Sequence, residues 1–135
     1  MSKLVHNQDL PNQPSMGRRH FDALAKQSTP TFPMHAVVGE RLLERLDGLN
    51  FSPKRVLDVG CGLGHHAIAL HQRFPQAQII AMDWSQAMAH KAAKKRGWWR
   101  RRFEVVVGDG AHPPIQPHSV DLVFANFVLA YTDEA

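Results

Sequence analysis

The sequence predicts an α/β fold, a doubly wound Rossmann-like sheet of mostly parallel strands. Three observations support this prediction. After Pro53, short runs rich in β-branched residues alternate with helical segments, which is typical of βαβ units whose parallel sheet is covered on both faces. The first of these runs breaks into glycines at positions 60, 62 and 64. Acidic or amide residues follow the ends of successive runs, where open α/β sheets bind their ligands.

Length and composition set the class of protein. The chain has 135 residues, 44% of them hydrophobic and 21% charged, which fits one globular domain at most. No apolar run approaches the roughly 20 residues that cross a bilayer, and the first ten residues lack the apolar core of a secretory signal. The single cysteine, Cys61, excludes an internal disulfide and fits a reducing compartment. We therefore expect a cytoplasmic protein without membrane contact.

A basic run between Lys91 and Arg102 carries much of the formal charge of +4 and includes Trp98 and Trp99. Such a run can contact nucleic acid, and its tryptophans can stack on bases. A solvated helix face followed by a loop accounts for the same residues, and we favour that interpretation. Nucleic acid is therefore not an expected partner.

The N-terminal third is expected to contain a tail and two helices. Residues 1–15 show little periodicity and are interpreted as a flexible tail. Residues 16–50 are expected to form helices that act as a lid or as a packed cover. The first should begin near Met16, and the second should carry Pro33 in its first turn and end near Gly48.

Residues 51–135 are expected to alternate strand and helix. The predicted strands are Arg55–Val59, Ala77–Met82, Phe103–Val107 and Val120–Ala125; the predicted helices span His65–Arg73 and Gln86 to about Arg96, with another beginning at Phe127. The fourth strand would lie at an edge, although its apolar residues are typical of a central strand. We therefore expect this part to be the first half of a longer domain, truncated after the fourth strand, or the exposed strand to be covered by another copy of the chain.

The glycine turn indicates the type of ligand. Glycines after a strand allow close approach of the backbone, and the following helix start offers free N–H groups. Asp58 stands two residues before Gly60, and a carboxylate there repels phosphate and attracts a cation or an amine. The expected ligand is nucleotide-like, with a positive, amino-acid-like part in place of a pyrophosphate.

The later strand ends add further ligand contacts. Asp83 lies 19 residues after Gly64, a spacing suited to a carboxylate that bridges two ribose hydroxyls. Trp84 or Met82 would lie against an adenine face. Asp109, between two glycines, would accept a hydrogen bond from the exocyclic amine of adenine. Each aspartate taken alone is as well explained as a helix cap or turn former, but their order along the strands favours a binding site.

The segment Asp58–Gly64 resembles the first motif of class I S-adenosylmethionine-dependent methyltransferases, and Asp83 and Asp109 match that family's ribose and adenine positions. The resemblance implies S-adenosylmethionine as cofactor, S-adenosylhomocysteine as product, and no metal. The expected cofactor-binding residues are Asp58, Gly60, Cys61, Gly62, Gly64, Asp83, Trp84, Gly108, Asp109, Gly110 and Asn126. Asn126 would either position the methyl acceptor or bond only to backbone.

A narrower resemblance is to the biotin-synthesis methyltransferases, the BioC family. It covers 19–22 and 40–46, then 108–114 and 124–131; where that family usually has Gln near position 35, this chain has His35. The resemblance implies methylation of the free carboxyl of a malonyl thioester, with the malonyl-bearing acyl carrier protein as partner. That acceptor is already ionised and needs no general base, so no catalytic residue is assigned. The groups that would hold it are expected beyond residue 135, and the chain alone is expected to be inactive.

Other functions remain open. The alternatives are a methyltransferase acting on another small molecule, such as a quinone-type acceptor, and a non-catalytic assembly or interaction module with the same fold. A nicotinamide dehydrogenase is disfavoured because its motif has glycine where this chain has His65, and because the Asp58 carboxylate would repel a pyrophosphate.

The histidines near the glycine turn do not indicate a metal site, because His65, His66 and His71 form no complete metal-ligand set. Cys61 is interpreted as a small residue packed in the turn.

Overall fold

The structure, a computed structural model, describes residues 16–27, 33–96 and 103–128. The expected tail over 1–15 and the tryptophans of the basic run lie outside the described residues. The helices are α1 (Met16–Ala25), α2 (Pro33–Leu46), α3 (His65–Arg73) and α4 (Gln86–Lys95), and the strands are β1 (Arg55–Val59), β2 (Gln78–Asp83), β3 (Phe103–Val107) and β4 (Leu122–Ala125). Their alternation after residue 53 confirms the predicted order of elements.

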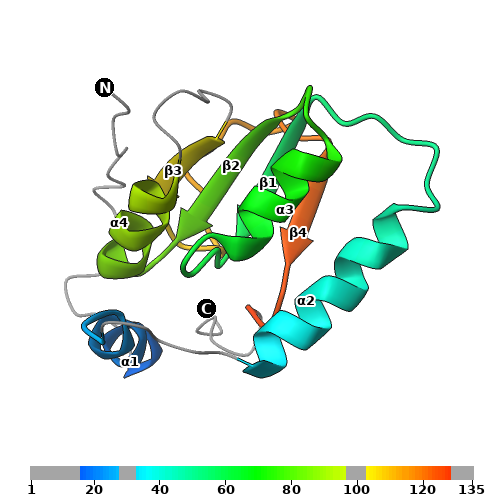
Figure 1. Cartoon of the computed structure of the whole chain (residues 1–135). Helices are drawn as coiled ribbons and strands as arrows, with labels where there is room; N and C mark the ends of the chain where they lie inside the picture. Colours follow the sequence, from blue (N-terminus) through cyan, green and yellow to red (C-terminus); the bar gives the residue numbers. More distant parts are fainter. Residues whose placement is uncertain (1–15, 28–32, 97–102, 129–135) are drawn as a thin grey trace.

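The described strands form one parallel sheet in the order β3-β2-β1-β4 (Figure 1). In the central pairs Val59 lies opposite Met82 and also opposite Ala125, while Asp83 lies opposite Val107. The carboxyl ends of the strands are therefore level. The residues that follow each strand meet along a single edge, and the predicted doubly wound topology is confirmed.

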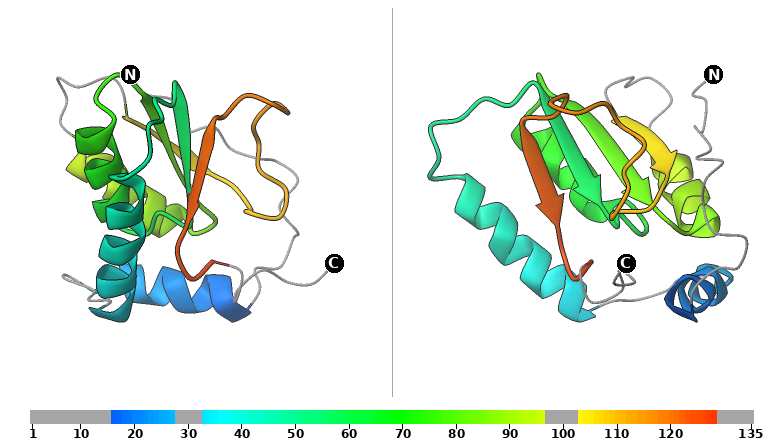
Figure 2. Two further views of the ribbon diagram at one scale, coloured as in Figure 1. Left: turned by 90° about the vertical axis from the view of Figure 1, so that its right-hand side faces the viewer. Right: turned by 180° about the vertical axis from the view of Figure 1, so that it is seen from behind.

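The two faces of the sheet are covered differently. Helices α3 and α4 lie on one face (Figure 1), and the connection between β3 and β4 crosses the other (Figure 2). The chain moves in one direction from β1 to β2 to β3, so right-handed crossovers place both helices on the same side. The helical face holds the larger apolar cluster, around Val56, Leu70 and Ile79, and the opposite face packs Leu57 and Met82 against residues that include Ile115.

Several boundaries differ from the sequence prediction. Strand β2 extends to Asp83, and β4 begins two residues later than expected, at Leu122. The preceding Asp121 is held by hydrogen bonds from the backbone N–H groups of Lys54 and Arg55 to its carboxylate, which fixes where β4 starts. No helix begins at Phe127, whose φ of 58° is left-handed.

The N-terminal helices lie toward the carboxyl ends of the strands (Figure 1). Helix α1 packs on α4, where Phe21, Leu24 and Ala25 meet Leu63 and Met88. Helix α2 packs on α3. Among the described residues, no helix combines the length and apolar character needed to cross a membrane.

Candidate functional site

A cavity of about 470 Å³ lies at the carboxyl ends of the strands. All of the proposed site residues except Gly64 line it. The lining therefore brings together the ends of all four strands: Asp58, Gly60, Cys61, Gly62, Asp83, Trp84, Gly108, Asp109, Gly110 and Asn126.

The three glycines of the first turn have different structural roles. All have positive φ, at 70° for Gly60, 53° for Gly62 and 86° for Gly64, a conformation that L side chains rarely adopt. A Cβ at Gly60 would lie 2.6 Å from a methyl of Val128, so this glycine makes room for the chain after β4. A Cβ at Gly62 would meet nothing within 4 Å. Gly62 is therefore the glycine that leaves open space at the cavity wall.

Gly64 serves packing. It precedes α3, and a Cβ there would lie 3.2 Å from Cβ of Ala92 and 3.6 Å from the ring of Phe103. The missing side chain lets α3 begin close against α4 and β3. The proposal that Gly64 contacts a ligand is thus not supported by its position, because Gly64 is buried and does not line the cavity.

Asp83 is tied to two segments of backbone. One carboxylate oxygen accepts a hydrogen bond from Gly62 N–H and the other from Ser85 N–H, both at 2.8 Å. Burial raises the pKa of Asp83 to about 6, against the lowering effect of these two hydrogen bonds. A carboxylate oxygen can accept more than one hydrogen bond, so both oxygens retain capacity for ligand hydroxyl groups.

Asp58 presents a buried acceptor without a partner. Its side chain is 2% exposed, it lines the cavity, and its Oδ2 has no hydrogen-bond partner among the described residues. Burial, and then the charge of Asp83, raise the pKa of Asp58 well above its ordinary value. An unpartnered buried carboxylate oxygen is costly to the fold. A cationic donor placed in the cavity would relieve that cost.

Asp109 shapes its own loop as well as the cavity. Its Oδ1 accepts a hydrogen bond from Ala111 N–H at 3.0 Å, a local turn of the kind aspartate favours. Its Oδ2 lies 3.8 Å from Nδ1 of the exposed His112. The flanking Gly108 is needed for packing, since a Cβ there would lie 2.6 Å from the ring of Pro114.

Asn126 joins the end of β4 to α2. Its side-chain N–H donates to the carbonyl of His35 at 2.8 Å, across 91 residues of sequence. Its Oδ1 is buried without a partner in the described part of the chain. This backbone contact is made to α2 rather than at the strand end, and the unpartnered Oδ1 leaves a second polar atom beside the cavity.

Aromatic and apolar side chains form another wall. Trp84 lines the cavity and its ring lies 6.5 Å from that of Phe21 of α1. Met82, the alternative residue for an adenine face, is 1% exposed and is not part of the lining. Its sulfur lies beneath Gly108 instead. The geometry therefore favours Trp84.

Sequence reasoning did not identify the residues that α2 and the start of α3 bring to the site. The polar ones are His35, Glu40, His65 and His66. Burial lowers the pKa of His65, and the charge of Lys95 lowers it further. Burial also lowers the pKa of His66, against the raising effect of the charge of Glu40. Only the three-dimensional placement of α2 beside α3 reveals them. In the described ranges, no cluster of His, Cys, Asp or Glu is suited to hold a metal.

The arrangement suits a nucleoside that carries a cationic group. Donors from a ribose match the remaining acceptor capacity of Asp83, an aromatic base matches Trp84, and an ammonium matches the unpartnered oxygen of Asp58. Cys61 is buried and its pKa is raised well above the ordinary value, mainly by burial, so it is not an activated nucleophile. The residues present therefore fit S-adenosylmethionine.

A methyltransferase domain family matches residues 56–135. The chain belongs to this family. Among curated relatives, the malonyl-[acyl-carrier protein] O-methyltransferase of Legionella pneumophila is 44% identical over 95 residues, which cover 70% of this chain and 33% of the relative. The protein of the same name from Xylella fastidiosa is 36% identical over 118 residues, covering 87% of the chain and 40% of the relative. The chain thus spans well under half the length of these relatives.

Solved structures confirm the predicted methyltransferase fold. Geranyl diphosphate C-methyltransferase from Streptomyces coelicolor superposes with a TM-score of 0.68 at 15% identity, covering 90% of this chain and 57% of that one. Phosphoethanolamine N-methyltransferase 1 of Haemonchus contortus gives 0.67 at 19% identity, over 86% of this chain and 26% of that one. Both of those structures contain S-adenosylhomocysteine. At this level of identity the likeness shows the fold alone.

Proposed function

We propose that the chain forms the cofactor site of an S-adenosylmethionine-dependent methyltransferase. The observation that carries the proposal is the buried, unpartnered Oδ2 of Asp58 in the wall of the same cavity as Gly62 and Asp83. A pyrophosphate would be repelled there, whereas the ammonium of a methionyl group supplies the missing donor.

Each remaining contact has a proposed task. Asp83 would accept hydrogen bonds from ribose hydroxyls, and Trp84 would lie against the adenine. Asp109 would accept from the exocyclic amine of adenine, with the N–H of Gly110 facing a ring nitrogen. Gly62 would allow the backbone to approach the ligand closely, since nothing lies within 4 Å of the place of its missing Cβ.

The cofactor supplies an electrophilic methyl group on a sulfonium. When bound, it would deliver this methyl to the acceptor, and the electron pair of the broken sulfur–carbon bond would remain on sulfur. The chain's contribution is to orient the reacting groups and to exclude water. Asp58 would hold the methionyl ammonium and Asp83 the ribose, which would orient the cofactor in the cavity.

We further propose a malonyl thioester on acyl carrier protein as the methyl acceptor. Support comes from the two relatives that are 44% and 36% identical, both named as malonyl-[acyl-carrier protein] O-methyltransferases. The free malonyl carboxyl is ionised at neutral pH. This acceptor therefore requires no general base.

Asp58→Asn tests the cofactor assignment, because the substitution changes stability and binding in opposite directions. Removing a buried carboxylate without a partner should raise the melting temperature, while loss of the charge should weaken S-adenosylhomocysteine binding by about tenfold or more. Calorimetric titration with S-adenosylhomocysteine, with NAD as the control ligand, measures the second effect. Equal affinity of Asp58→Asn and the wild type, or tighter binding of NAD, would contradict the proposal.

A chimera tests the acceptor. Residues 56–128 of this chain replace the matching segment of the Legionella pneumophila relative, and transfer of labelled methyl to malonyl-carrier protein is measured. We expect turnover with the malonyl-carrier protein and none with the acetyl form, which lacks the free carboxyl. A folded chimera that binds S-adenosylhomocysteine without methylating the malonyl form would refute this acceptor while leaving the cofactor assignment intact.

A further inference from the structure

A chain of hydrogen bonds connects α1 to the glycine turn. The hydroxyl of Ser85 donates to Asp22 of α1, across 63 residues of sequence. The backbone N–H of Ser85 donates to Asp83, and the other oxygen of Asp83 accepts from Gly62 N–H. The polar side chain of α1 therefore reaches the cavity wall through one buried serine and one buried carboxylate.

Ser85 is well placed to transmit a displacement. It is fully buried, and its Oγ also accepts from Met88 N–H at 3.2 Å, capping α4. Its position is thereby fixed relative to α4, and its remaining side-chain bond is the one to Asp22. If Asp22 moved away, the donor hydroxyl of Ser85 would be left buried without an acceptor, which disfavours separation of α1 from α4.

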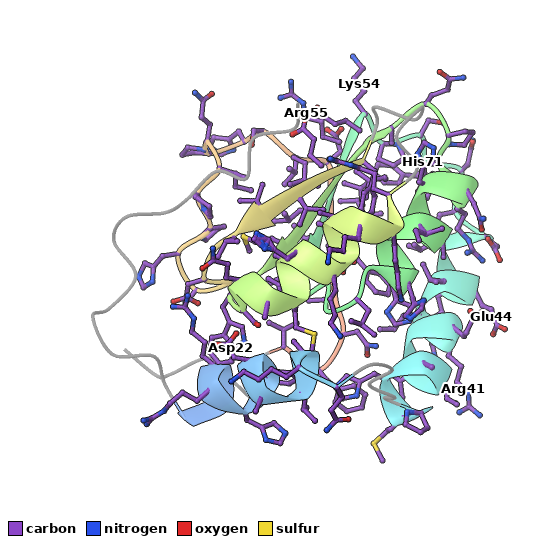
Figure 3. All side chains as sticks on the ribbon, turned by 60° about the vertical axis from the view of Figure 1, so that its left-hand side comes forward. Asp22, Arg41, Glu44, Lys54, Arg55 and His71 are labelled. Atoms are coloured by element: carbon purple, nitrogen blue, oxygen red, sulfur yellow. The ribbon has the colours of Figure 1, made fainter. Side chains whose placement is uncertain are left out.

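Apolar contacts place the same helix over the cavity. Phe21, the neighbour of Asp22, lines the cavity and faces Trp84. Leu24 and Ala25 pack with Leu63 of the glycine turn. Beyond the end of α1, Lys91 of α4 donates to the carbonyl of Gln27 at 2.5 Å. Figure 3 shows Asp22 on the side of α1 that faces α4.

We propose that Asp22 is a positioning residue that couples the docking of α1 to cofactor binding, through Ser85 and Asp83. The inference rests on the proposed cofactor site. Docked α1 fixes Ser85, Ser85 orients the Asp83 carboxylate, and that carboxylate holds the ribose. Such coupling is reciprocal. If docking of α1 increases the affinity for the nucleoside by some factor, the bound nucleoside increases the docking equilibrium constant of α1 by the same factor.

The test compares wild type with Asp22→Ala, Asp22→Asn and the same-helix control Arg19→Ala. Arg19 is exposed on α1, so its truncation leaves the contact with Ser85 in place. Asn keeps an oxygen that can accept from Ser85, and Ala does not. Two quantities are measured for each protein: the dissociation constant of S-adenosylhomocysteine by calorimetry, and the hydrogen-exchange protection of the α1 amides with and without that ligand.

In the wild type, we expect ligand to increase α1 protection by about tenfold, the scale of one hydrogen bond to a charged group. Asp22→Ala should lose this increase and weaken binding by a similar factor. Arg19→Ala should behave like wild type, and Asp22→Asn, whose neutral oxygen accepts a weaker hydrogen bond from Ser85, should retain part of the increase. A merely structural Asp22 would lower the melting temperature of Asp22→Ala without changing the ligand-dependent part of protection.

Two results would overturn the coupling. One is wild-type protein that binds S-adenosylhomocysteine while α1 protection stays the same, which decides the question even if Asp22→Ala does not fold. The other is Asp22→Ala that retains the full ligand-dependent gain. Failure of wild type to bind S-adenosylhomocysteine at all would instead refute the proposed function, so the two failures are distinguishable.

Discussion

At the residue scale, the carboxylate of Asp83 serves the protein backbone and the cavity together. Its two oxygens anchor Gly62 and Ser85, and its burial raises the pKa to about 6. The folded state therefore holds the proton more tightly than the unfolded state, whose Asp pKa is near 3.9. Ionised Asp83 costs stability at neutral pH, and ligand hydroxyl groups that donate to it would recover part of that cost.

This gives a pH prediction for Asp83→Asn. The free energy of unfolding of wild type, minus that of the variant, should fall by about 2 kcal/mol as pH rises from about 4 to 7. The folded state binds more protons in that window, so raising the pH removes stabilisation. Urea unfolding at several pH values measures the difference. Parallel pH curves for the two proteins would show that Asp83 is not perturbed. Asp58, whose pKa is raised by burial and then by the charge of Asp83, acts in the same direction.

The glycine turn gives a second prediction, with Gly62→Ala and Gly64→Ala as a matched pair. Both place a side chain at positive φ, which costs about 1–2 kcal/mol. Gly64→Ala adds crowding against Ala92, so thermal unfolding should show it to be the more destabilised protein. Gly62→Ala adds a methyl at the cavity wall, so calorimetry should show S-adenosylhomocysteine bound about tenfold more weakly. Equal loss of affinity in both variants would contradict this division of tasks.

The sequence predicted the carboxylates that line the cavity because each lies near the end of a strand in a parallel sheet, and level strand ends bring them together. It did not reveal that Gly64 packs, because that depends on how closely α3 approaches Ala92. Nor did it reveal the bond from Asn126 to the carbonyl of His35, which joins positions 91 residues apart. Local pattern identifies residues at strand ends, whereas pairings between distant helices and strands follow from packing.

At the element scale, α2 and α3 approach closely through a glycine. A Cβ at Gly39 would lie 2.0 Å from the ring of His66, which is itself packed at 5.7 Å from the ring of Phe124. The glycine therefore allows α2 to bring His35 and Glu40 to the cavity. Periodicity predicted α2 as a helix, but it gave no reason for a helix-weakening glycine at its centre.

A double-mutant cycle tests this contact. Gly39→Ala should destabilise the wild type by about 1–3 kcal/mol because the new methyl displaces the His66 ring. In the background of His66→Ala the same substitution should stabilise by up to about 1 kcal/mol, since alanine favours the helix. Urea unfolding of the four proteins gives the coupling energy. The same effect in both backgrounds would mean that α2 does not pack on His66.

At the scale of the whole molecule, the described sheet has β3 at one edge and β4 at the other. Strand β4 pairs with β1 on one side, and Val123 within it is 55% exposed. Edge strands with unpaired backbone groups and apolar side chains are templates for association with another chain. An edge strand with the apolar character of a central strand is therefore expected to promote self-association, which depends on protein concentration.

We expect the chain to self-associate through β4, and Val123→Lys to weaken that association. A lysine on an edge strand opposes pairing because two copies would bring like charges together. Sedimentation velocity over a concentration series should show a rising mean mass for wild type and a smaller rise for the variant. Phe51→Lys, which adds the same charge at another exposed apolar residue away from β4, is the control and should follow wild type. A constant monomer mass for wild type at every concentration would contradict association. Equal effects of the two lysine variants would show that the added charge, rather than the strand edge, causes the reduced association.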